Sequence, residues 1–178
     1  MRELDTFRRA MHVDRLHTVP TITGQTIGEH TANAIAIALT IAGYSSVDVN
    51  KLAIVTHLLE HDAAEIYTGD VPAPAKVENA ELAIALRAVE RKWAEENHIH
   101  SYPAAEQLTP EETAIAKAAD WLDLMGFAIF EIQLGNQHMQ EVYRNIRSYI
   151  NSGLRYTVPG VDQIASYYEE QYHVCQGS

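Results

Sequence analysis

The stretch Leu58-Leu59-Glu60-His61-Asp62-Ala63-Ala64-Glu65 lies at the end of an apolar helical run and places a histidine directly before an aspartate. This pair brings one imidazole nitrogen and one carboxylate oxygen to the same small volume, and both suit a borderline divalent ion such as zinc, manganese or cobalt. Glu65 follows Asp62 by three positions, so on a helix its carboxylate would lie on the same face and could move a proton beside the metal. Two ligands do not hold a metal in water, so the pair predicts a site only if other segments supply more.

The composition indicates one domain over residues 1–178 and excludes several classes of protein. No apolar run approaches the roughly 20 residues of a membrane span, and the acidic start at residues 1–5 lacks the apolar segment of a signal peptide. The net charge is −11 and no basic stripe is present, so we expect neither a membrane nor a nucleic-acid partner. Cys175 is the only cysteine, which excludes an internal disulfide, argues against a cysteine-phosphatase mechanism and fits a reducing cytoplasm.

Apolar residues recur at helical spacing along most of the chain, which predicts an all-α bundle of about six or seven helices and no strands. The segments Thr26–Glu29 and Thr109–Glu112 have the form of capping boxes and indicate two helix starts. Two prolines predict an extended segment at residues 71–75. The expected helices cover residues 4–11, 26–43, about 45–62, 76–97, 109–134 and 137–152, with a last one after Pro159.

Three of these helices present a candidate metal ligand. His30 follows a capping box, His61 and Asp62 lie where their helix breaks, and Asp120 lies among small residues in the middle of a long amphipathic helix. An unpaired buried aspartate costs several kcal/mol, so Asp120 needs a cation or hydrogen-bond donors if it faces inward. In a helical bundle, metal sites are built from side chains that project inward from different helices.

The ordered set His…His-Asp…Asp resembles the HD-domain phosphohydrolase superfamily. The run from His61 to Lys76 is similar to the His-Asp-x-x-Glu-x-x-Thr-Gly-Asp-x-Pro-x-Pro-x-Lys stretch of the bacterial 5′-deoxynucleotidase branch, which also takes in phage dATP triphosphohydrolases. Arg15, Glu29-His30 and the segment 117–120 match as well. The resemblance covers about residues 15–136, and it implies a single HD-domain helical bundle.

The resemblance also implies roles for residues of this chain. It implies that one divalent metal (Zn, Co or Mn) is held by His30, His61, Asp62 and Asp120. It implies that Glu65 and Asp70 are the catalytic acids. The substrate-binding positions that it implies are Arg15, Leu16, Thr68, Pro74 and Lys76. Leu16 departs from the family pattern, in which a tryptophan at this position helps to enclose the sugar, so the selectivity for deoxyribose and base stays open.

The implied function is metal-dependent hydrolysis of deoxynucleotides, with a small-molecule nucleotide as substrate. Two reactions remain open: release of phosphate from a dNMP, and release of triphosphate from a dNTP such as dATP. The alternatives are a non-catalytic helical nucleotide-binding or signalling module, and an alarmone hydrolase, which Ile66 disfavours because those enzymes carry an acid at that position. The resemblance also implies a homo-oligomer, in the cytoplasm of a bacterium or of the host cell if a phage encodes the chain.

Overall fold

The computed structural model describes residues 2–97, 99 and 108–176, and the regular secondary structure of this part of the chain is helical apart from one short ribbon. The all-α prediction is therefore confirmed. Seven of the helices have nine or more residues, in line with the expected number: α1 (Arg2–Ala10), α2 (Ile27–Ala42), α3 (Lys51–Glu60), α6 (Ala80–Glu96), α7 (Pro110–Gln133), α8 (Met139–Asn151) and α10 (Val161–Gln176). Three are short: α4 (Glu65–Thr68), α5 (Ala73–Glu78) and α9 (Leu154–Thr157).

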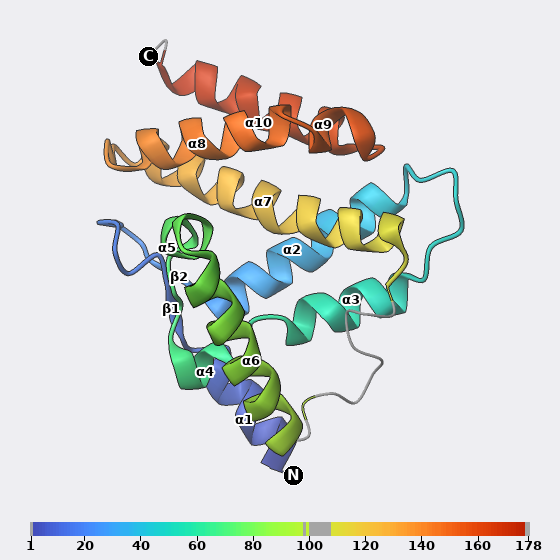
Figure 1. The fold of residues 1–178 in the computed structure, drawn as a ribbon. Helices are drawn as coiled ribbons and strands as arrows, with labels where there is room; N and C mark the ends of the chain where they lie inside the picture. The colour runs from blue at the N-terminus through green and yellow to red at the C-terminus, as the bar shows by residue number, and fades with distance from the viewer. Residues whose placement is uncertain (1, 98, 100–107, 177–178) are drawn as a thin grey trace.

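Helix α7 is the centre of the molecule. It packs against α2 and α3 on one side and against α8 and α10 on the other, so that it crosses the middle of Figure 1. Alanines are buried where α2 and α7 meet, among them Ala34, Ala38, Ala118 and Ala119, all with 0% exposure. Small side chains let two backbones approach closely, which brings residues of both helices within reach of a shared ion.

A second, smaller layer contains α1, α4 and α6, which lie together at the N-terminal end of the molecule (Figure 1). Ala10, Ala63, Ala94 and Ile99 form its buried cluster, with Phe7 and Trp93 packed against them. None of the described helices is both long and apolar enough to cross a bilayer.

Both predicted capping boxes are present. The Thr26 hydroxyl accepts from the Glu29 N–H, and the Glu29 carboxylate accepts from the Thr26 N–H at 2.8 Å. Thr109 and Glu112 repeat this arrangement at the start of α7. Each box satisfies backbone donors that a helix start would leave unpaired, and it sets the residue at which the helix begins.

Three predicted boundaries are wrong. Helix α3 begins at Lys51 and not near Ser45, because Asn50 is the residue that caps it. The segment predicted to be extended enters helix α5 at Ala73, where a proline at one of the first helical positions is tolerated. The helix expected over residues 76–97 is divided at Asn79, whose side chain accepts from the Leu82 N–H and starts α6. The loop expected at residues 98–108, with His98 and His100, lies almost entirely outside the described residues.

The expectation of no strands is also wrong, because the structure contains one small two-stranded ribbon. Strands β1 (Asp14–Arg15) and β2 (Gln25–Thr26) pair antiparallel, with Asp14 opposite Thr26 and Arg15 opposite Gln25. Two-residue strands are too short to show an alternating pattern in a sequence. The ribbon ties the loop that carries Arg15 to the start of α2.

A buried carboxylate fixes the far end of the same loop. Glu131 on α7 has 0% exposure and accepts from the backbone N–H groups of Ile22 and Thr23, at 2.7 and 2.8 Å. The Thr23 hydroxyl and the Asn136 amide donate to it as well. Burial alone would raise the pKa of Glu131, but these four donors outweigh it and lower the pKa to about 2.

We expect Glu131→Gln to destabilise the protein at pH 7 by on the order of 2 kcal/mol, because the amide replaces an anion among donors that point at it. The folded-state pKa lies below the ordinary value of 4.5, so the contribution of the charge is complete above pH 4.5 and is lost as the pH falls toward 2. Urea unfolding of both proteins at pH 7 and pH 4 should show the gap narrowing on acidification. Glu141→Gln, at an exposed position of α8, is the control and should show no gap.

Candidate active site

Three helices bring the predicted metal ligands together. His30 lies in the first turns of α2, His61 and Asp62 directly follow α3, and Asp120 lies in the middle of α7. Nε2 of His30 is 3.1 Å from Asp120 Oδ1 and 3.6 Å from Asp62 Oδ2, and Nε2 of His61 is 3.2 Å from the same Asp62 oxygen. The side chains of His30, His61 and Asp62 offer ligand atoms that all lie within 4.8 Å of one another.

The donor set fits a divalent metal. Nε2 of His30 and Nε2 of His61 are both buried, and neither has a hydrogen-bond partner of good geometry among the described residues. Buried polar atoms without partners are rare and costly, so two imidazole nitrogens beside two carboxylates call for a shared cation. Two nitrogen and two oxygen ligands suit zinc, cobalt or manganese.

The other nitrogen of each imidazole is held by an acceptor. Nδ1 of His61 lies 2.8 Å from the Leu58 carbonyl, and Nδ1 of His30 lies 2.7 Å from Asp123 Oδ2. A carbonyl or carboxylate oxygen can only accept, so Nδ1 carries a proton in both rings, and Nε2 is the nitrogen of each ring that is left to bind a metal. Both rings are therefore oriented as a metal requires.

The charges of the cluster perturb two of its members. Burial alone would lower the pKa of His30, but the Asp120 and Asp123 carboxylates raise it to about 9. Burial would raise the pKa of Asp120, but His30, His61 and Arg15 lower it to about 2. The pocket therefore favours a positive charge at Nε2 of His30, and a proton and a metal cation compete for that atom.

Glu65 lies at the start of α4 with 7% exposure. Burial first, and then repulsion from Asp62 and Asp70, raise the pKa of Glu65 to about 9. Its Oε2 is buried without a hydrogen-bond partner among the described residues. A carboxyl group in this state keeps its proton near pH 7 and can give it up, which is the property of a general acid.

Asp70 holds the backbone beside Arg15. Its Oδ2 accepts from the Leu16 N–H at 2.9 Å, across 54 residues of sequence. Leu16 has a φ of 58°, a left-handed conformation that is strained for a branched side chain. The hydrogen bond helps to hold Leu16 in that conformation, so Asp70 stabilises the loop. Its carboxylate also lies close enough to Glu65 to raise the pKa of that residue.

The other predicted substrate residues lie on α4 and α5. The Thr68 hydroxyl is 3.4 Å from Glu90 Oε1 of α6. Pro74 is exposed at the start of α5. Lys76, half-buried in the same helix, lies close enough to Glu65 and Glu90 to offset part of the rise that burial causes in the pKa of each. Lys76 is thus on the Glu65 side of the cluster.

Arg15 lies on the side of the cluster formed by α7. Its Nη2 is 3.9 Å from Asp120 Oδ1, its Nη1 is 3.7 Å from Asp123 Oδ2, and Nη1 donates to Gln25 Oε1 at 3.2 Å. Contacts of 3.7 Å and more are longer than a tight guanidinium–carboxylate pair. The guanidinium therefore still has donors to offer an incoming anion.

Two residues of the cluster were not among the sequence-based candidates. Asp123 follows Asp120 by three positions, so the helical spacing could have placed both carboxylates on one face of α7. Gln25 carries no such signal, because only the β1–β2 pairing brings it opposite Arg15. His57, one turn before His61, has its ring 5.8 Å from that of His61 and is not part of the ligand cluster.

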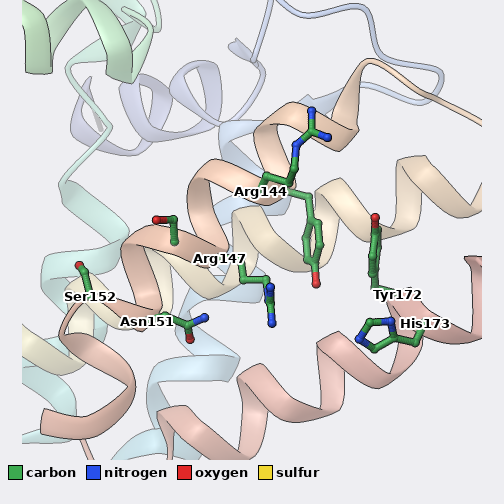
Figure 2. A pocket seen from close by; sticks show the side chains of 8 residues that line it. Arg144, Arg147, Asn151, Ser152, Tyr172 and His173 are labelled. Carbon is green, nitrogen blue, oxygen red and sulfur yellow. The ribbon is translucent and has the colours of Figure 1, made fainter.

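A separate cavity of about 550 Å³ lies between α8 and α10, and its lining residues include Arg144, Arg147, Tyr172 and His173 (Figure 2). None of the predicted site residues lines it. Arg147 is paired there with Glu169, whose other oxygen accepts from Arg155. This cavity is therefore distinct from the cluster around His30.

Two solved structures share the fold. The HD phosphohydrolase of cyanophage S-2L, solved bound to dA and one catalytic Zn²⁺ ion, aligns with a TM-score of 0.72 at 22% identity, covering 98% of this chain and 96% of that one. An HD-domain phosphohydrolase from Listeria innocua aligns with a TM-score of 0.72 at 21% identity, covering 98% and 88%. The fold is therefore that of the HD-domain phosphohydrolases.

The chain belongs to the family described as 5′-deoxynucleotidase YfbR-like, whose model matches residues 4–170. A 5′-deoxynucleotidase of Photorhabdus temperata is 27% identical over 141 residues, which cover 70% of each protein. A dATP triphosphohydrolase of Salmonella phage PMBT28 is 31% identical over 77 residues, 39% of this chain and 40% of that one. The predicted superfamily and branch are confirmed, and the enzyme class is favoured over a non-catalytic module.

We expect Zn²⁺, Co²⁺ or Mn²⁺ to raise the melting temperature of the protein, because a ligand that binds only the folded state stabilises it, by about 2.7 kcal/mol at 100 times its Kd. His61→Gln should abolish the metal-induced shift, since it removes a ligand nitrogen. The matched control is His57→Gln, which removes a neighbouring imidazole outside the cluster and should keep the shift. Equal shifts in the two variants would contradict this assignment of the ligands.

Proposed function

We propose that this chain is a metal-dependent 5′-deoxynucleotidase that releases inorganic phosphate from deoxynucleoside monophosphates. The observation that carries the proposal is the convergence of two unpartnered imidazole nitrogens with the carboxylates of Asp62 and Asp120, next to the buried acid Glu65. Membership of the 5′-deoxynucleotidase family supports the class of substrate. In this proposal the domain takes in the whole chain, residues 1–178.

His30, His61, Asp62 and Asp120 would hold one divalent cation. When bound, such an ion lowers the pKa of a water molecule and polarises a phosphoryl oxygen. The Zn²⁺ in the cyanophage protein supports zinc as one candidate, beside cobalt and manganese. Asp120, with 36% of its side chain exposed, lies where the cluster opens toward solvent, so its carboxylate would meet both the ion and the substrate side.

Arg15 and Lys76 would bind the phosphate from two sides. The planar guanidinium of Arg15 can donate two hydrogen bonds to phosphate oxygens, which a lysine would reproduce poorly. Leu16, Thr68 and Pro74 would line the nucleoside side. Asp70 holds the strained backbone at Leu16, and this fixes the position of the neighbouring Arg15 backbone, from which the guanidinium extends.

Glu65 would move the proton. Water adds across the phosphorus–oxygen bond, and the 5′-oxygen leaves with a proton as the nucleoside alcohol. The raised pKa keeps the Glu65 carboxyl protonated near pH 7, so it would give that proton to the leaving oxygen. The carboxylate that remains would then take up the proton released from the water, which restores the acid. Asp70 would contribute by raising the pKa of Glu65 and by holding the loop.

The charge around the cluster favours a monophosphate over a triphosphate. Arg15 and Lys76 are the cations that lower the pKa of Glu65, and Arg15 is shared among Gln25, Asp120 and Asp123. A triphosphate carries about twice the charge of a monophosphate, and the net charge of −11 repels both. Release of triphosphate from dATP is the second candidate, which the phage relative supports.

The two reactions differ in their products. Incubation of the purified protein with Co²⁺ or Mn²⁺ and a panel of dNMPs, dNTPs and ribonucleotides should release inorganic phosphate from the dNMPs, detected by phosphate assay and chromatography. Triphosphate with deoxyadenosine from dATP would support the second candidate instead. Removal of the metal with a chelator should abolish turnover, and its return should restore it.

We expect Glu65→Gln to lower kcat by about 100-fold or more, the usual contribution of a general acid or base. The affinity for Co²⁺ should stay within a few-fold of the wild-type value, because Glu65 is not among the ligands. Glu81→Gln, at an exposed position of α6, is the control and should leave kcat unchanged. Loss of Co²⁺ binding in Glu65→Gln would show that Glu65 serves the metal and not the proton.

A homo-oligomer in the cytoplasm stays a prediction. Large apolar side chains are exposed on α2, on α10 and at the C-terminal end of α7, and they support an interface between copies of the chain: Leu39, Phe130, Leu134 and Tyr167, with 41%, 47%, 46% and 57% exposure. Sedimentation of the purified protein at several concentrations tests it.

A further inference from the structure

Gln25 occupies an unusual position between the two halves of the site. It lies on β2, directly opposite Arg15 in the ribbon, and only 4% of it is exposed. Buried glutamines are uncommon unless every polar atom of the amide has a partner. Both polar atoms of the Gln25 amide have one.

The two partners of Gln25 carry opposite charges. Nη1 of Arg15 donates to Gln25 Oε1 at 3.2 Å, and Gln25 Nε2 donates to Asp123 Oδ2 at 2.9 Å. The same Asp123 oxygen lies 2.7 Å from Nδ1 of His30. A continuous chain of hydrogen bonds therefore leads from the Arg15 guanidinium to the His30 imidazole.

An amide is the side chain that suits this position. It accepts from a cation with its oxygen and donates to an anion with its nitrogen, whereas a carboxylate only accepts and an ammonium or guanidinium only donates. Its partners also fix its orientation, because the reverse would set a donor against Arg15 and an acceptor against Asp123. With the amide in place, Arg15 Nη1 lies 3.7 Å from Asp123 Oδ2, which is longer than the distance in a tight ion pair.

We propose that Gln25 is a positioning residue that couples the two halves of the site: it holds Asp123 against His30 for metal binding and holds the Arg15 guanidinium away from Asp123 for phosphate binding. This inference rests on the proposed function, because it takes His30 as a metal ligand and Arg15 as a phosphate contact. Without the amide, Arg15 can close onto Asp123 as a direct ion pair. That pair would draw Arg15 from the substrate and compete with His30 for the same carboxylate oxygen.

The test uses Gln25→Met, which keeps the length and shape of the side chain and removes both hydrogen bonds. Gln133→Met, at an exposed position of α7, is the matched control. Circular dichroism and the melting temperature without metal check that each variant folds. Co²⁺ alone is then titrated into each protein, and its affinity and visible absorption spectrum are recorded without substrate.

We expect Gln25→Met to weaken Co²⁺ binding by about tenfold or more, the usual effect of losing a group that orients a ligand. With saturating Co²⁺, KM for a deoxynucleoside monophosphate should rise more than kcat falls, because Arg15 contributes to binding. Gln133→Met should match the wild type in both. A lower melting temperature alone, with unchanged Co²⁺ affinity and KM, would overturn the proposal and leave Gln25 a packing residue.

A double-mutant cycle with Asp123→Asn separates coupling from general damage. If Gln25 acts through Asp123, the double variant should bind Co²⁺ about as weakly as Asp123→Asn does alone. Effects that multiply would overturn the coupling, as would a rise in KM without a loss of Co²⁺ affinity in Gln25→Met. If the wild-type protein binds no Co²⁺, the proposed function is refuted. If the wild type binds Co²⁺ and hydrolyses the substrate, and Gln25→Met does both equally well, only this inference is refuted.

Discussion

The structure depends on one constraint, a fully buried imidazole placed between carboxylates. His30 has 0% exposure, with Asp123 on its Nδ1 and Asp120 beside its Nε2. Both carboxylates come from α7, and the close packing of α2 on α7 through alanines makes this approach possible. An apolar side chain at position 30 would remove the hydrogen-bond partner of the buried Asp123 carboxylate, so the helix pair and the cluster stabilise each other.

The loop between α1 and α2 is held in place from three directions. The ribbon pairs Arg15 with Gln25, Asp70 accepts from the Leu16 N–H, and Glu131 binds Ile22 and Thr23. Asp70 and Glu131 are carboxylates that accept from backbone N–H groups more than 50 residues away in sequence. An irregular segment has few hydrogen bonds of its own, so such anchors fix its conformation and with it the position of Arg15.

Four of the acidic side chains lie in or beside the cluster, where a cation would use their charge. With a net charge of −11, the protein as a whole repels an anionic nucleotide. Asp62, Asp70, Asp120 and Asp123 surround the cluster, and a divalent ion with Arg15 and Lys76 would reverse the local sign. Burial, and then the carboxylates of Asp62 and Asp70, raise the pKa of Glu65, so in the proposed reaction the same charges would serve both ion binding and proton transfer.

The sequence by itself determined the helical class and the two capping boxes, because these follow from periodicity and from local hydrogen bonds within a few residues. The candidate ligands came from the resemblance of its motifs to a known family. The sequence thus also indicated the family, which the comparison confirmed. The tertiary structure alone decided the roles of Asp123, Gln25 and Glu131, because their partners lie 93 to 109 residues away along the chain. The start of α3 and the break at Asn79 were predicted wrongly for a related reason. Several residues near each helix start could serve as its N-cap, and the packing of the chain decides which one does. Local patterns specify helices and name candidates, whereas hydrogen bonds between distant segments decide which side chains form a site.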